Sequence, residues 1–181
     1  MFILYGLVLG LALGFLLGGR ADGLASLQFR WGWVFAAGLG VQVILFSDPV
    51  TERIGEFGVP IYIISTALVA LAVLANRRIA GMPLVALGAL TNLAAIVANG
   101  GYMPASAEAM AVLGKTPPTV YSNSTFIADP RLAPLTDIFA LPPWLPWANV
   151  FSPGDVLIGA GVVVVIVTAM RRRPAALVGA A

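Results

Sequence analysis

Five uncharged apolar stretches constrain the fold of this chain more than any other feature. They cover residues 1–18, 31–46, 59–75, 83–98 and 156–170, each slightly shorter than the ~20 residues that a helix needs to cross a bilayer. Charged residues make up only 10% of the chain, against roughly 25% in a soluble domain. We therefore expect an all-α membrane bundle, a single domain over residues 1–181. Its five transmembrane helices are predicted over about 1–18, 31–46, 59–75, 83–98 and 154–170.

The basic residues are divided unevenly between the two sides of this bundle. Because loops rich in Lys and Arg stay in the cytoplasm, the side with more of them is expected to be cytoplasmic. This predicts a multi-pass protein of the bacterial plasma membrane, with the N-terminus outside and the C-terminus in the cytoplasm. One side carries Arg20, Arg30, Arg77, Arg78, Arg171, Arg172 and Arg173, and the other carries Arg53, Lys115 and Arg131.

The first apolar stretch carries glycines at a spacing of four residues. At ~3.6 residues per turn, Gly6, Gly10, Gly14 and Gly18 line one face of a helix. Small residues at this spacing allow a second helix to approach closely. The face is expected to pack either against the second or fifth helix of the same chain, or against another membrane subunit.

Residues 99–153 form the one long stretch between apolar segments. It holds nine of the 13 prolines, which stiffen an irregular backbone. We expect an ordered extracytoplasmic loop with a short helix capped by Ser106. Trp144 and Trp147 are expected to contact lipid, since indoles favour the membrane interface. The segment 48–58 is expected to form an acidic turn.

The residue types present narrow the possible chemistry. The chain has no Cys and no His, which excludes thiolate and His-ligated metal sites and the Ser-His-Asp triad. We expect no metal and no cofactor. The net charge of +2 follows from the membrane topology, so no nucleic acid is expected as a partner.

Two carboxylates in the second half of the chain are the candidate catalytic groups. Ser152-Pro153-Gly154-Asp155 has the pattern of a helix-capping box, so Asp155 either caps the fifth helix or works at the membrane boundary. Asp137 lies in an apolar patch and is either a turn residue or the second carboxylate. Two carboxylates held close together share a proton and can act as acid and base.

Several polar residues near the outer boundary are candidates for binding substrate or lipid. Asn92 lies within the fourth apolar stretch, where it either bonds a neighbouring helix or orients a substrate. Asn99, Gly100 and Gly101 follow that stretch. They form either a helix C-cap and turn or a shaped ledge beside the carboxylates.

The chain as a whole resembles an uncharacterised family of small five-helix bacterial membrane proteins. The resemblance rests on Leu17-Gly18-Gly19-Arg20, on Asn99-Gly100-Gly101 followed by Met103-Pro104, and on Val150-Phe151-Ser152 followed by Gly154-Asp155. The resemblance implies the five-helix topology and no function.

A narrower stretch, residues 135–161, is similar to the end of signal peptidase II, the lipoprotein signal peptidase. Asp137 matches an Asp in that family's pattern, and Phe151 through Asp155 match the motif that opens its last helix. The resemblance implies paired carboxylates on the outer side. Ala95 stands where that family carries its other catalytic Asp, and Asp129 is a candidate substitute.

These observations leave two functional hypotheses. The favoured one is a non-catalytic accessory, assembly or lipid- or peptide-binding subunit of a membrane complex. Its partners would be membrane lipid and, through the glycine face of the first helix, other membrane subunits. The alternative is an aspartic hydrolase of the signal peptidase II type that acts on a lipid-linked peptide at the outer face, with Asp155 and either Asp137 or Asp129 as the carboxylates.

Overall fold

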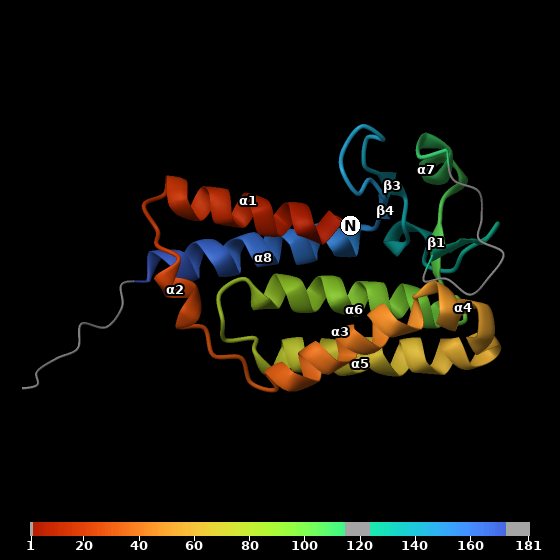
Figure 1. Cartoon of the computed structure of the whole chain (residues 1–181). Coiled ribbons are helices and arrows are strands. Elements are labelled where there is room, and N and C mark those ends of the chain that lie inside the picture. Colours follow the sequence, from red (N-terminus) through yellow and green to blue (C-terminus); the bar gives the residue numbers. More distant parts are fainter. Residues whose placement is uncertain (1, 115–123, 173–181) are drawn as a thin grey trace, which may run out of the picture.

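The computed structural model describes residues 2–114 and 124–172, which are largely helical (Figure 1). Each of the five long helices begins and ends within two residues of the predicted bounds. They are α1 (Phe2–Leu16), α3 (Gly32–Leu45), α5 (Gly58–Ala75), α6 (Met82–Ala98) and α8 (Pro153–Arg171). The short helical elements are α2 (Asp22–Ala25), α4 (Asp48–Ile54), η1 (Gly55–Phe57), α7 (Ala107–Val112) and η2 (Ala133–Leu135).

The long helices pack side by side in the order α3, α5, α6, α8, α1. The last helix in the chain therefore lies between the first helix and α6 (Figure 1). The segment between α6 and α8 gathers at one end of the bundle. The element α2 and the turn between α5 and α6 lie at the opposite end.

Within the described part of the chain, two helical stretches are long and apolar enough to cross a membrane by length and composition. They are Asp48–Ala75, which joins α4, η1 and α5, and Pro153–Arg171. The helices α1, α3 and α6 are apolar but shorter. The predicted crossing of the membrane by all five helices stays a prediction.

The glycines of α1 face α8. A Cβ on Gly6 would lie 2.9 Å from the backbone of Gly159, and one on Gly14 would lie 2.3 Å from Met170 Sδ. Gly10 is similarly close to Ile166. This face of α1 is therefore covered within the chain. Gly18 does not share in the packing, because it follows the end of α1 with φ +75° and has no atom within 4 Å of an ideal Cβ.

The segment from 99 to 153 contains more regular structure than its prolines indicated. Strand β1 (Met103–Ala105) pairs in parallel with β2 (Ser124–Phe126), and β3 (Phe139–Ala140) pairs antiparallel with β4 (Val150–Phe151). The predicted cap of α7 is confirmed, since Ser106 Oγ accepts a hydrogen bond from Ala109 N at 3.1 Å.

The acidic segment after α3 is a helix where a turn was expected. Ser47 has the extended backbone of an N-cap residue, and Pro49 lies in the first turn of α4, where its missing N–H costs nothing. The carboxylate of Asp48 in that first turn is favourable at the positive end of the helix dipole. These local features start a helix despite the polar composition.

The helices α6 and α8 cross in very close contact. A Cβ on Gly88 of α6 would lie 2.3 Å from the carbonyl oxygen of Gly154. Further along the same interface, a Cβ on Gly161 would lie 2.6 Å from the side chain of Val85. Both positions require glycine because the opposing backbone and branched side chains cannot withdraw.

We expect Gly88→Ala to lower the free energy of unfolding by about 1–3 kcal/mol, since the added methyl group would strike the backbone of α8. Gly40→Ala in α3 is the matched control. It meets no atom within 4 Å and should be neutral or stabilise the helix by about 0.5–1 kcal/mol. Thermal unfolding of the purified chain in detergent measures both effects. Equal melting temperatures for the two variants would contradict the close crossing.

Candidate functional site

The crossing of α6 and α8 places Asn92 against the first turn of α8. Gly88 and Asn92 are four residues apart on α6, so they share one face of that helix. A Cβ on Gly154 would lie only 2.0 Å from Asn92 Oδ1. Glycine at this position is what lets the amide of Asn92 reach the start of α8.

Ser152 and Asp155 form the predicted capping box at the N-terminus of α8. Ser152 Oγ accepts from the backbone N of Asp155 at 3.0 Å, and Asp155 Oδ2 accepts from the backbone N of Ser152 at 3.2 Å. Ser152 is fully buried. The box satisfies two backbone N–H groups at the helix start and brings a carboxylate to its positive end.

Asn92 joins this box into one hydrogen-bonded network. Its Nδ2 donates to Asp155 Oδ1 at 2.9 Å, and its Oδ1 accepts from Ser152 Oγ at 2.8 Å. Both oxygens of Asp155 therefore accept hydrogen bonds. The network fastens the C-terminal half of α6 to the start of α8.

Asp137 reaches the same place from the segment between α6 and α8. Its backbone N donates to Pro104 O at 2.9 Å, and its carbonyl accepts from Ser106 N at 3.0 Å. These bonds extend β1 by an isolated parallel bridge between Ala105 and Asp137. Asp137 as a whole is only 5% exposed, so this residue is held inside the protein.

Asp137 and Asp155 line one small cavity of about 120 Å³, which we call the acceptor pocket. Its other polar walls come from Tyr62 on α5, from Asn92 and from Asn149 beside β4. Among the described residues, no Lys or Arg lines it. The full lining is Tyr62, Asn92, Ile96, Met103, Asp137, Asn149, Val150 and Asp155.

The composition of the acceptor pocket determines what it can bind. Ionised carboxylates only accept hydrogen bonds, and amides and the phenol can do both. The pocket therefore favours a group that carries N–H donors or a positive charge. Two carboxylates on one pocket are also the arrangement in which a proton is shared between acid and base.

The third carboxylate of the sequence prediction lies elsewhere. Asp129 is exposed and does not line the acceptor pocket. Of the three predicted carboxylates, the structure brings together Asp137 and Asp155. Of the two predicted partners of Asp155, Asp137 shares its pocket and Asp129 does not.

Of the two alternatives for residues 99–101, the structure has the helix cap and turn, and Asn99 also clamps a distant residue. Asn99 Nδ2 donates to Ala95 O and to Arg131 O, both at 2.8 Å, while its Oδ1 accepts from Arg131 N at 2.8 Å. Gly100 and Gly101 turn the chain with φ of +71° and +93°. None of the three lines the acceptor pocket, so their role here is to hold the segment after β2 against α6.

The two tryptophans of the segment point outward. Trp144 is 80% exposed and Trp147 is 71% exposed. They lie outside the acceptor pocket, and their predicted contact with lipid stays a prediction. The neighbouring Pro146 is held by α1, because Tyr5 Oη donates to its carbonyl oxygen at 2.5 Å.

Three polar residues that line the acceptor pocket or bond its walls were not among the predicted site residues. Tyr62 and Asn149 line the acceptor pocket, and Ser152 connects Asn92 to the capping box. For Ser152 the capping pattern was a signal that its side chain is engaged. Tyr62 could have been noticed as one of few polar side chains in α5. Asn149 follows a proline-rich stretch, and nothing near it in the sequence indicates its role.

The family comparison assigns the chain to a family of unknown function. The model of DUF5317, a family of unknown function, matches residues 26–167, and the chain belongs to this family. The match includes every residue that lines the acceptor pocket and begins after α1. No curated protein and no solved structure matches the chain.

We expect Asn92→Ala to lower the free energy of unfolding by about 1–3 kcal/mol, because it removes a donor to Asp155 and an acceptor of Ser152. Ser152→Ala should cost about 1 kcal/mol through the lost cap. The double variant should cost less than the sum, with a coupling of about 0.5–3 kcal/mol. Additive losses measured in denaturation would show that the two contacts act independently.

Proposed function

We propose that this chain is a multi-pass plasma-membrane protein with a non-catalytic binding role at the outer face. The acceptor pocket would bind an N–H-bearing or cationic group of a lipid or lipid-linked peptide. One observation supports binding over catalysis. Both oxygens of Asp155 are already engaged by Asn92 and Ser152, which fixes the carboxylate as an acceptor in the pocket wall.

The membrane placement is supported by the surface of the bundle. Large apolar side chains on α3 point outward, among them Trp33 at 75% and Val43 at 74% exposure. Exposed apolar surface on this scale is unfavourable in water and marks a lipid or protein contact. The helix ends that carry most arginines lie opposite the segment between α6 and α8 (Figure 1), as the positive-inside rule requires.

This placement predicts a labelling pattern that the cysteine-free sequence makes easy to measure. Ala128→Cys, exposed in the segment between α6 and α8, should react with a membrane-impermeant maleimide on intact spheroplasts. Ala80→Cys, exposed in the turn between α5 and α6, should react only after permeabilisation. The wild-type chain is the blank. The reverse pattern, or equal labelling of both, would contradict the topology.

The size of the acceptor pocket limits how much of a ligand it can hold. A cavity of about 120 Å³ accommodates a few polar atoms, well below the ~300–1,000 Å³ of sites that enclose drug-sized ligands. The pocket would therefore recognise one polar group of a larger molecule. The rest of that molecule would lie along the apolar helix faces or in the membrane.

A second candidate function is the aspartic hydrolase. One observation favours it: Asp137 and Asp155 line the same partly enclosed pocket. It also agrees with the resemblance of residues 135–161 to signal peptidase II. In this alternative the two carboxylates would share a proton and activate a water molecule against a peptide bond. Ala95 on α6, where signal peptidase II carries an Asp, argues against identical machinery.

One experiment separates the two functions. The purified chain in detergent is given a synthetic diacylglyceryl-cysteine peptide, and both binding and cleavage are followed, the latter by mass spectrometry. We expect binding without cleavage, and Asp137→Asn should weaken binding roughly tenfold, because a charge-assisted hydrogen bond is worth about 1.5–3 kcal/mol.

Asp129→Asn is the matched control for this experiment. It makes the same charge change at an exposed site outside the pocket and should leave binding unchanged. Cleavage that both Asp137→Asn and Asp155→Asn abolish would establish the hydrolase instead. Binding that is insensitive to Asp137→Asn would remove the acceptor pocket from either function.

A further inference from the structure

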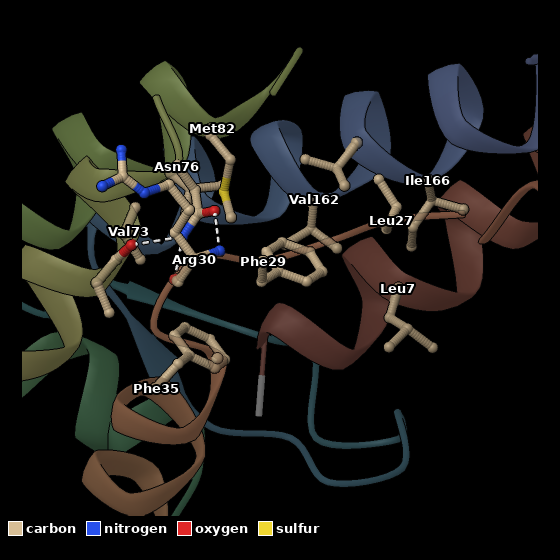
Figure 2. A pocket seen from close by; sticks show the side chains of 14 residues that line it. Leu7, Leu27, Phe29, Arg30, Phe35, Val73, Asn76, Met82, Val162 and Ile166 are labelled. Atoms are coloured by element: carbon tan, nitrogen blue, oxygen red, sulfur yellow. Dashed lines mark hydrogen bonds between the residues drawn. The ribbon is translucent and has the colours of Figure 1, made fainter. Parts of the chain in front are cut away.

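A second cavity lies at the opposite end of the bundle from the acceptor pocket. Its volume is about 400 Å³, and its walls are almost entirely apolar (Figure 2). All five long helices contribute to it, through residues that include Leu7, Phe35, Val73, Met82 and Val162. A space of this size with such walls suits a hydrocarbon chain.

One edge of this apolar cavity is basic. Arg30 and Asn76 line both the apolar cavity and an adjoining space of about 230 Å³, which is also lined by Arg77 and Arg78. The three arginines are exposed, and no acidic side chain of the described residues lines either space. Within residues 2–114 and 124–172 the one ion pair is Arg20 with Asp22, so these guanidinium groups have no carboxylate partner there.

The backbone of this basic edge is held firmly. Asn76 is only 6% exposed. Its Nδ2 donates to Arg30 O at 2.8 Å, and its Oδ1 accepts from Arg30 N at 2.8 Å (Figure 2). The same Nδ2 donates to Ala72 O at 2.7 Å. This clamp joins the residue before α3 to the end of α5, and it holds the backbone of Arg30 where Arg30 lines the adjoining space together with Arg77 and Arg78.

We propose that the two spaces together bind one anionic phospholipid. An acyl chain occupies the apolar cavity, and the phosphate and anionic headgroup contact Arg30, Arg77 and Arg78. Basic pockets between helices on the cytoplasmic side of a membrane bind such headgroups, and each nearby Lys or Arg strengthens the attraction. The proposal rests on the membrane placement given above, but it concerns a different site from the acceptor pocket.

The headgroup half of the proposal is tested by lipid preference. The full chain in mild detergent is titrated with dioleoyl-phosphatidylglycerol or dioleoyl-phosphatidylcholine, and bound lipid is counted by native mass spectrometry. We expect one phosphatidylglycerol per chain, with a preference of roughly tenfold over phosphatidylcholine. The double variant Arg77→Gln with Arg78→Gln should lose this preference. Arg53→Gln on α4, at the other end of the bundle, should keep it.

The binding of the acyl chain is tested by substitutions that fill the apolar cavity. Val162→Phe should abolish the bound lipid, because Val162 points into the space (Figure 2). Val164→Phe on the same helix is the control, since Val164 does not line the cavity. If Val162→Phe fails to fold, Leu7→Phe narrows the same cavity from α1, where Leu7 is 43% exposed. Both cavity variants should retain the helical circular dichroism of the wild type.

Three outcomes would overturn the proposal. The two lipids could bind equally, or the preference for phosphatidylglycerol could survive the double arginine substitution. Inorganic phosphate alone could also raise the melting temperature of the protein as much as the lipid does. The last would indicate a simple anion site. A chain that is correctly inserted by the maleimide test but has no lipid preference would overturn only this inference, and the proposed membrane placement would stand.

Discussion

The close crossing of α6 and α8 is the contact on which the rest of the structure depends. Glycines at 88 and 154 bring the two backbones together, and the hydrogen bonds among Asn92, Ser152 and Asp155 fasten α6 to the first turn of α8. The opposite face of α8 receives α1, and the strand β4 enters α8 directly. Displacing α8 would therefore disturb the acceptor pocket and the packing of α1 together.

Two asparagines make the same pattern of hydrogen bonds at the two ends of the bundle. Asn76 follows α5 and Asn99 follows α6, and each bonds the carbonyl four residues earlier and both backbone groups of a distant residue. A primary amide suits this task because it presents donors and an acceptor side by side. The first clamp shapes the mouth of the apolar cavity, and the second positions the segment that leads to Asp137.

Apart from α4, the local structure could be predicted from the sequence, whereas most contacts between distant residues could not. The helix bounds follow from apolar runs, and the caps by Ser106 and Ser152 follow from short patterns. For Asn99 the sequence left a helix cap and a binding ledge open, because nothing near it in the sequence indicates Arg131 as its partner. Tyr62 and Asn149 meet Asp137 and Asp155 only through tertiary packing, which no local pattern encodes.

The clamp at Asn99 depends on a side-chain amide that is open to deamidation. Asn99 is followed by Gly100, the neighbour that least hinders attack of the backbone nitrogen on the side-chain amide, and asparagine is among the thermolabile residues. Deamidation would replace the Nδ2 donor with a carboxylate oxygen facing two carbonyls, those of Ala95 and Arg131. Two hydrogen bonds would be replaced by repulsion between the new carboxylate oxygen and the two carbonyl oxygens. The hydrogen bonds that hold the amide in place therefore also oppose deamidation, and losing them would release the segment after β2 from α6.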